Sequence, residues 1–348
     1  MMRVRRCLRC VVAHVTIFFA FGAAGRDTND DLTMASRRAA SVLKERQETP
    51  GYWLTSYTPA ARFENAAREM NTCMTAVLVD FLEPVAKAAG LGESVERARR
   101  HLARQIEPSG LVRYHGLPDA PTIGTLGCAI TPDADDTALV WRIAPGKPAE
   151  SLSAALAVLD RYRTAEGLYR TWLAPPDRYR CIDPGKDPNP VDAGIQMHVF
   201  LLLAQTDPPA ARTLCEALRR RIADDRIWVY NQAASLVQIL RQADLKKAGC
   251  PIQLPASRLR TAVPGQEIWV KACLLLERFL SGDAPAPASA ETLALLRTLS
   301  DDGFAAIRSS PPLLYNNDFT ASTPRFYWSE EFGYALWLRL FFESSHRN

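Results

Sequence analysis

A short turn signature recurs along this 348-residue chain at nearly constant spacing. Gly51, Gly110 and Gly167 each follow a polar stretch, and they are 59 and 57 residues apart. The segment 223–228 occupies the next position with similar residues but no glycine, and Gly303 follows at a longer interval. A period of this size is typical of stacked or closed arrays of two-helix units.

Each predicted unit combines an arginine- and alanine-rich helix with a more apolar one. A helix with one polar face suits an outer layer, whereas a helix that is apolar all round suits the interior. We therefore predict an all-α fold, an (α/α)6 barrel, in which residues 26–348 form a single toroid domain. The predicted outer helices cover residues 35–46, 93–105, 149–163 and 209–222, and the predicted inner helices cover 70–89, 136–143, 191–204, 228–240, 267–280 and 326–342.

Polar residues precede several of the predicted inner helices at similar distances from the repeat glycines. Because equivalent positions of a closed ring meet at one end, we expect these side chains to converge at one mouth of the barrel. Some of them are also residue types that cap helix N-termini. The set comprises Asn71, Asp133, Asp135, Asp136, Asn189, Asp192, Asn231, Glu330 and Glu331.

The most acidic part of this set is the segment Asp133-Ala-Asp135-Asp136, which begins an apolar run. Carboxylates this close raise the pKa of at least one member, because like charges repel. A protonated carboxyl beside apolar residues can act as a general acid. Aspartates are also favoured at helix N-termini, so capping alone is an alternative interpretation. We take Asp133, Asp135 and Asp136 as candidate catalytic residues.

The first 25 residues have the pattern of a secretory signal peptide. Four arginines precede an apolar run that ends in small residues, and the run is short for a membrane span. This pattern predicts a periplasmic or secreted protein, whereas a true start at Met34 would make it cytoplasmic. The net charge of +4 equals those four arginines, so the neutral body favours no nucleic acid partner.

The cysteine pattern gives no sign of a metal or cofactor site. The six cysteines that follow the N-terminal segment include no Cys-x-x-Cys pair, and the sequence has no phosphate-binding glycine loop. We therefore predict no metal and no cofactor. Export would allow some of the six cysteines in the body to form disulfides.

Three segments resemble those of the terpenoid cyclases, specifically the squalene–hopene and class II diterpene cyclases. Gln47-x-x-x-Gly51-x-Trp53 resembles the repeated Gln-Trp motif of that toroid. Asp133-Ala-Asp-Asp-Thr-Ala resembles the Asp-x-Asp-Asp acid motif of the same enzymes. The segment 326–336, with the sequence Phe-Tyr-Trp-Ser-Glu-Glu-Phe-Gly-Tyr-Ala-Leu, resembles the closing helix. The resemblance covers residues 34–343.

The resemblance implies an isomerase, an intramolecular cyclase that acts on a hydrophobic isoprenoid. Asp135 would protonate a C=C bond or an epoxide to start carbocation cyclisation, with Asp133 and Asp136 holding its proton in place. Aromatic side chains would stabilise the cation through their π-faces. The predicted substrate-binding residues are Trp53, Trp141, Asp192, His198, Trp328 and Glu330. Class II cyclases enclose their substrate between two barrels, so a single barrel predicts that a partner subunit or a peripheral membrane contact covers its mouth.

Two other functional classes are compatible with the sequence. A secreted (α/α)6 carbohydrate-active enzyme needs two carboxylates, roughly 5 Å apart for retention or 6.5–9.5 Å apart for inversion. Asp135 with Glu330 or Asp192 could supply that pair. Alternatively, a non-catalytic toroid would bind a ligand or partner protein and use the acidic cluster only for capping.

Overall fold

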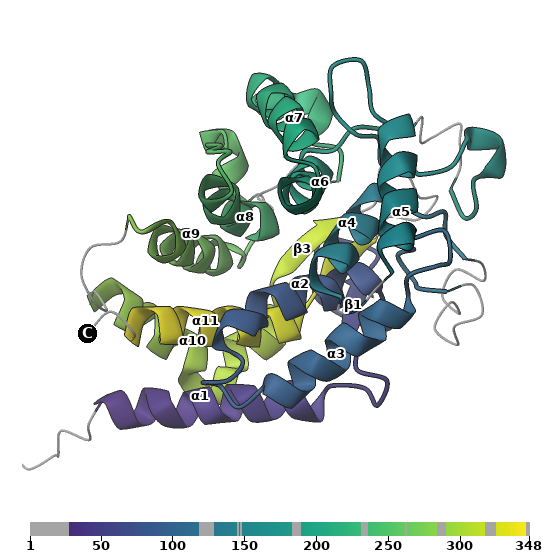
Figure 1. Cartoon of the computed structure of the whole chain (residues 1–348). Helices are drawn as coiled ribbons and strands as arrows, with labels where there is room; N and C mark the ends of the chain where they lie inside the picture. The colour runs from purple at the N-terminus through teal and green to yellow at the C-terminus, as the bar shows by residue number, and fades with distance from the viewer. Residues whose placement is uncertain are drawn as a thin grey trace, which may run out of the picture.

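A computed structural model describes residues 28–117, 129–144, 146, 148–182, 189–230, 236–261, 263–283, 290–316 and 325–345. The predicted signal peptide and Asn231 lie outside these residues. The described chain is mostly helical (Figure 1). The helices are α1 (Thr28–Glu45), α2 (Thr72–Leu82), α3 (Gly92–Arg104), α4 (Ala134–Ile143), α5 (Ala149–Arg161), α6 (Ala193–Thr206), α7 (Pro208–Arg221), α8 (Leu236–Lys247), α9 (Glu267–Ser281), α10 (Ala290–Ser309) and α11 (Glu330–Ser345).

The more apolar helices contact one another in a closed cyclic order. Along this ring the order is α2, α4, α6, α8, α9 and α11, and α11 contacts α2 in turn. The other long helices lie outside it, with α1 against α10 and α11, α3 against α2 and α4, α5 against α4, and α7 against α6 (Figure 1). Helix α6 is buried on every side from Ala193 to Leu203, as its apolar sequence predicts.

The repeat glycines join each helix pair to the next. Gly51, Gly110 and Gly167 have positive φ angles of 114°, 81° and 91°, and each donates its N–H to the carbonyl three residues earlier. Positive φ is readily adopted by glycine alone. A side chain on these glycines would meet the next outer helix, at Arg97 in α3, Ser151 in α5 and Thr213 in α7, and one on Gly303 would meet Arg38 in α1. The last turn therefore abuts the first outer helix.

Replacing Gly110 with alanine tests this role. We expect Gly110→Ala to lower the free energy of unfolding by about 2–5 kcal/mol, because a Cβ would combine left-handed strain with a clash against the Ser151 carbonyl. Gly249→Ala is the matched control, since Gly249 has a φ of 85° and open space around it. Urea unfolding of both variants measures the difference, and equal losses would contradict a packing role for Gly110.

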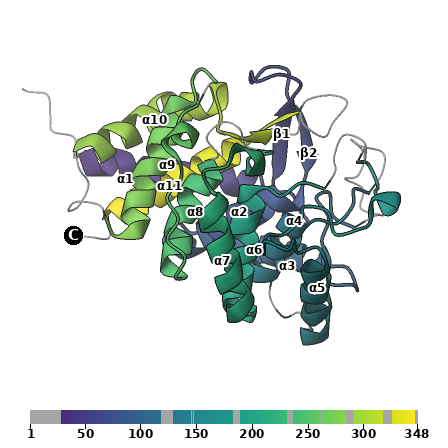
Figure 2. The same ribbon diagram turned by 90° about the horizontal axis from the view of Figure 1, so that it is seen from above.

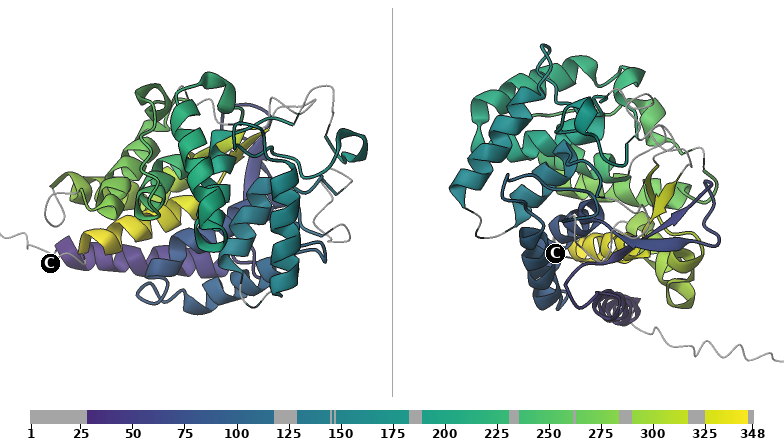
Figure 3. Two further views of the ribbon diagram at one scale, coloured as in Figure 1. Left: turned by 45° about the horizontal axis from the view of Figure 1, so that its top comes forward. Right: turned by 90° about the vertical axis from the view of Figure 1, so that its right-hand side faces the viewer.

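A small antiparallel sheet corrects the prediction of an all-helical chain. Its strands are β1 (Leu54–Thr58), β2 (Ala67–Met70), β3 (Leu313–Asn316) and β4 (Phe326–Trp328), in the order β2-β1-β4-β3. Strand β4 pairs with β1, with Tyr57 opposite Tyr327 (Figures 2 and 3). Residues 326–328 were predicted as helix, but their aromatic side chains favour a strand and α11 begins only at Glu330.

The sheet lies at one end of the ring. Strand β2 ends at Met70, just before α2, and β4 ends at Trp328, just before α11. The sheet therefore adjoins the N-terminal ends of these two inner helices. Each half of the sheet comes from a different end of the described chain.

A disulfide links two elements of the ring's periphery. Cys215 in α7 is bonded to Cys250, which follows α8, at a sequence separation of 35. Cys181 is also disulfide-bonded, whereas Cys73 and Cys273 are free thiols. In the residues that the structure describes, none of the helices is both long and apolar enough to span a bilayer.

Candidate functional site

The first turn of α4 is anchored on both sides. Asp133 caps the helix, with its carboxylate accepting the N–H of Asp136 at 2.7 Å. The N–H of Asp133 donates to the carbonyl of Val112, and that of Ala134 donates to the carbonyl of Thr171 at 2.8 Å. These bonds fix the direction in which the next side chain, Asp135, leaves the helix.

The side chain of Asp135, in the first turn of α4, contacts residues of two other inner helices, α2 and α6. Its Oδ1 lies 2.5 Å from Nδ1 of His198 in α6, and its Oδ2 accepts the thiol of Cys73 in α2 at 3.6 Å. The Asp135 side chain is 24% exposed. The flanking carboxyls of Asp133 and Asp136 are buried, and Asp136 accepts the hydroxyl of Thr72. The structure thus brings the three aspartates together with His198, and it leaves Asp135 as the accessible carboxyl.

His198 is buried, and its Nε2 has no hydrogen-bond partner within the described part of the chain. Burial lowers the pKa of His198, against the opposing effect of Asp135. A neutral imidazole can donate from Nδ1 to a carboxylate or accept its proton there. His198 is therefore suited to respond to the protonation state of Asp135.

Burial also favours the protonated form of the neighbouring carboxyls. It raises the pKa of Asp133 well above its usual range, and the adjacent Asp136 adds to the effect. Burial raises the pKa of Asp136 to about 6, although bonds from Asp133 and Thr72 oppose it. The pKa of the Cys73 thiol is raised by burial and by Asp135, so the thiol remains a donor. In weakly acidic solution, Asp135 is therefore surrounded by the protonated forms of Asp133, Asp136 and Cys73.

This shift predicts an unusual pH dependence of stability. The pKa of Asp136 is about 6 in the folded protein, whereas an unperturbed aspartate has a pKa of 3.8. The native state therefore binds more protons between these values and loses stability as pH rises through them. Asp136→Asn removes this loss and keeps an oxygen for Thr72. We expect its free energy of unfolding, relative to the native sequence, to rise by up to about 3 kcal/mol from pH 4 to pH 7.

Urea unfolding at the two pH values measures that change. Asp177→Asn serves as control, because Asp177 is exposed in the short η3 helix (Pro176–Arg178). A relative stability of Asp136→Asn that stays constant or falls between pH 4 and pH 7 would contradict the burial of a raised-pKa carboxyl.

Asp192 and Asn189, both expected at the mouth, have structural roles. Oδ1 of Asp192 accepts the N–H groups of Gly194 and Ile195, and Oδ2 accepts those of Val229 and Tyr230. Burial raises the pKa of Asp192 to about 6, although the Tyr230 and Gly194 bonds oppose it. The side chain of Asn189 bonds both the N–H and the carbonyl of Trp172. Asn71 likewise caps α2 through the N–H of Met74.

The three tryptophan candidates are core residues whose indole N–H groups are hydrogen-bonded. Trp53 donates to the carbonyl of Leu43, Trp141 to that of Gly110 and Trp328 to the hydroxyl of Thr58. All three are 9% exposed or less. Beside Trp53, the Gln47 amide donates to the carbonyls of Gly51 and Ser94 at 2.8 Å, which ties α1 to α3 as the Gln-Trp resemblance implies.

Glu330 forms a different cluster from Asp135. Its Oε2 lies 2.8 Å from Nη2 of Arg46, the residue that follows α1, and the neighbouring Glu331 pairs with Arg46 and Arg68. These pairs connect the start of α11 to α1 and the sheet. Glu330 is thus ion-paired with a cation, and no described contact joins it to Asp135.

Sequence reasoning missed a tyrosine cluster on the sheet. Tyr315 in β3 stacks on Tyr327 in β4 with ring centroids 4.4 Å apart, and the hydroxyl of Tyr114 bonds that of Tyr315. Burial raises the pKa of Tyr315, with contributions from Tyr327 and from Cys73, which places this ring near the thiol beside Asp135. Tyr315 therefore lies near the acid cluster, and the rings of Tyr114 and Tyr327 pack against it.

Other buried polar groups adjoin the same region. Glu69 in β2 lies 3.3 Å from Nε2 of His115 and 3.4 Å from Nη1 of Arg325. Among the residues that the structure describes, no group of three or more His, Cys, Asp or Glu side chains is arranged to hold a metal ion.

Comparison with known proteins adds evidence about the fold. No protein-family model and no curated protein matches the chain. The crystal structure of a protein from Actinoplanes is 16% identical, with a TM-score of 0.50 over 90% of this chain and 100% of that chain. The apo type II terpene cyclase MstE from Scytonema is 13% identical, with a TM-score of 0.33 over 92% of this chain and 100% of that chain. A variant of MstE in complex with geranylgeranyl dihydroxybenzoate is 12% identical to this chain, with a TM-score of 0.34. The match to the Actinoplanes protein shows a shared fold, and none of these matches shows a function.

Proposed function

We propose that this chain is a single-barrel class II terpene cyclase-like enzyme that protonates an isoprenoid C=C bond or epoxide with Asp135. The observation that carries the proposal is the contact of the Asp135 carboxyl with both His198 and Cys73. These two contacts hold the Asp135 carboxyl in one orientation between α2 and α6. Asp135 is also the most accessible of three crowded carboxyls, so it is the one placed to reach a substrate.

The reaction needs only the residues of this chain and the substrate. The protonated Asp135 gives its proton to the alkene, and the electron pair of the double bond forms the new C–H bond and leaves a carbocation. Ring closure then moves the cation along the substrate, and final loss of a proton makes the product an isomer. Because an alkene is a weak base, the acid works best where water is excluded.

The closed helical ring and the sheet support the same assignment. The cyclic order of α2, α4, α6, α8, α9 and α11 is the arrangement expected of an (α/α)6 toroid. The Tyr315 ring, which lies near Cys73 and packs against Tyr114 and Tyr327, is suited to stabilise a cation, in place of the tryptophans expected from the sequence. We retain His198 as a partner of the acid and propose structural roles for Trp53, Trp141, Trp328, Asp192 and Glu330.

The carbohydrate-active alternative receives less support. It requires a second carboxylate that is free to act as base or nucleophile. Asp192 already accepts four backbone N–H groups, and Glu330 is ion-paired with Arg46. The acid site therefore lacks its proposed partner.

We also propose that the protein is exported and that a partner subunit or a membrane surface covers the acid-bearing end of the ring. The Cys215–Cys250 disulfide supports export, because disulfides persist in oxidising compartments. The mature N-terminus of protein recovered from the source cells tests the first point. Cleavage near residue 25 is expected, and a chain that begins at Met34 would overturn it.

Incubation with farnesyl, geranylgeranyl and squalene substrates in D₂O tests the cyclase proposal. We expect an isomeric product that carries one added deuterium, detected by mass spectrometry, because the initiating proton comes from an exchangeable acid. Asp177→Asn should give the same product yield. Absence of any isomer, or an isomer without deuterium, would overturn proton-initiated cyclisation.

A further inference from the structure

A cavity lies toward the end of the ring opposite Asp135. Helix α2 carries Cys73 in its first turn and Asp80 near its end, and seven residues of helix span about 10 Å. The cavity has a volume of about 170 Å³ and is bounded by α2, α8, α9 and α11. This volume is far above the roughly 10–15 Å³ that a single water needs.

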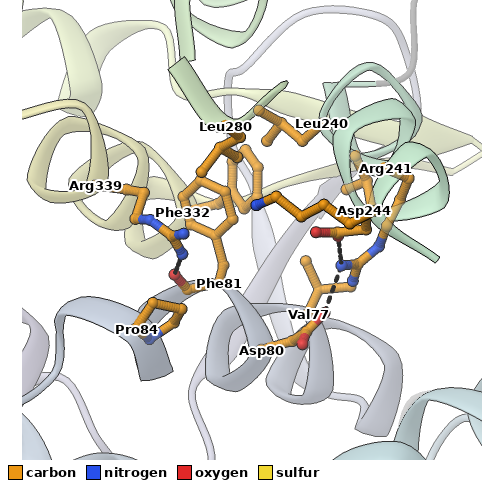
Figure 4. Close-up of a pocket in the computed structure, with 12 residues that line it drawn as sticks. Val77, Asp80, Phe81, Pro84, Leu240, Arg241, Asp244, Leu280, Phe332 and Arg339 are labelled. Carbon is orange, nitrogen blue, oxygen red and sulfur yellow. Dashed lines mark hydrogen bonds and ion pairs between the residues drawn. The ribbon is translucent and has the colours of Figure 1, made fainter. Parts of the chain in front are cut away.

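One wall of this cavity is a buried charge cluster. Nη1 of Arg241 bonds Asp244 at 2.8 Å and also pairs with Asp80 (Figure 4). Arg142 in α4 pairs with the same Asp80 carboxylate. Burial opposes ionisation of Asp80, but Arg241 and Arg142 hold its pKa below the usual range. Arg241 is 6% exposed, and its Nε has no hydrogen-bond partner among the described residues. This guanidinium therefore retains a buried donor without an acceptor.

Another cation stands across the cavity, on α11. Arg339 donates from Nε to Glu343 at 2.8 Å and from Nη1 to the carbonyl of Phe81 at 2.9 Å (Figure 4). Lys247, at the end of α8, is exposed and lines the cavity as well. Within the described residues, no partner is recorded for the Lys247 ammonium.

The polar groups of the lining leave donors in excess. Each carboxylate in it already faces a guanidinium, whereas the three N–H donors of the exposed Lys247 ammonium have no acceptor among the described residues. Three cations against two carboxylates give the lining one net positive charge. Between the charged groups the surface is aliphatic and aromatic, from Phe81, Leu240, Leu280 and Phe332 (Figure 4).

We propose that this cavity binds a small amphipathic carboxylate, with its oxygens at Lys247 and its hydrocarbon body against the apolar wall. The carboxylate supplies the acceptors that the lining lacks and brings its net charge to zero. A hydrocarbon body fills volume that water would otherwise occupy beside Phe81 and Phe332. The site is separate from the Asp135 cluster and does not depend on the function proposed there.

Calorimetric titration of the purified protein with sodium octanoate tests the proposal. We expect one octanoate per chain, with weaker binding of acetate and no binding of octylamine. Lys247→Gln should weaken octanoate binding at least tenfold, as should Arg339→Gln if it folds. Lys246→Gln is the matched control, because Lys246 pairs with Asp283 instead and should leave binding unchanged.

Several outcomes of the same titrations would contradict the proposal. If octanoate failed to bind, or bound equally to Lys247→Gln and the native protein, the proposal that this cavity binds a carboxylate would be wrong. Octylamine binding as tightly as octanoate would overturn the charge argument. Inorganic phosphate competing as well as octanoate would overturn the role of the apolar wall.

Discussion

Asp135→Asn should reduce cyclisation of an accepted isoprenoid by at least about 10³-fold, within the range that a general acid supplies. The amide keeps the size of the side chain and can still contact His198, but it has no acidic proton to give. The exposed fraction of the Asp135 side chain, 24%, makes a large loss of stability unexpected. Single-turnover product formation measures the loss, and far-UV circular dichroism checks that the fold persists.

Variants of the neighbouring side chains separate the acid from its supports. Cys73→Ser keeps a donor toward Oδ2 and should retain most activity, whereas His198→Ala removes the closest contact of Asp135 and should act on the rate rather than on substrate affinity. Asp177→Asn remains the unaffected control. If Asp135→Asn turned over substrate at the native rate, the initiating acid would have to lie elsewhere.

Asp192→Ala should be among the most destabilising single substitutions in the chain, with a loss of about 4 kcal/mol or more. The carboxylate of Asp192 accepts four backbone N–H groups, two of them buried in the first turn of α6 and two of them half-buried at residues 229 and 230. Each donor left without an acceptor costs about 1–3 kcal/mol, partly offset because a buried carboxylate is also removed.

Urea unfolding and product assays together distinguish the two roles considered for Asp192. Asp192→Asn retains one acceptor oxygen, so we expect a smaller loss of stability than for alanine. A folded Asp192→Asn variant should remain active if the residue only joins α6 to the segment after η4 (Asp225–Ile227). A stable but inactive variant would instead restore the paired-carboxylate mechanism.

The features that could be predicted from the sequence are those with local chemistry. The glycine turns are visible because positive φ selects glycine, and the Asp133 cap is visible because aspartate precedes an apolar run. The convergence of α2, α4 and α6 follows from the repeat. The repeat does not predict the environment of Glu330. This residue occupies a similar position along its helix, but it is ion-paired with Arg46 outside the ring.

The sheet and the tyrosine cluster could not be predicted in the same way. Strand β4 has three residues and pairs with a strand more than 260 residues earlier, so neither segment alternates long enough to reveal a face. Tyr315 acquires its position near Cys73 only after that pairing. Trp53, Trp141 and Trp328 illustrate the reverse error, because a sequence cannot distinguish an aromatic ring that lines a cavity from one that fills the core.

The pairing of β1 with β4 also sets the order of events during synthesis. A ribosome must make residue 328 before β4 can meet β1, and must make α11 before the ring can close on α2. Until then the N-terminal helices lack their final neighbour, and contacts between distant segments form slowly. The closed ring of inner helices therefore forms only at the last stage of folding, after α11 has been made.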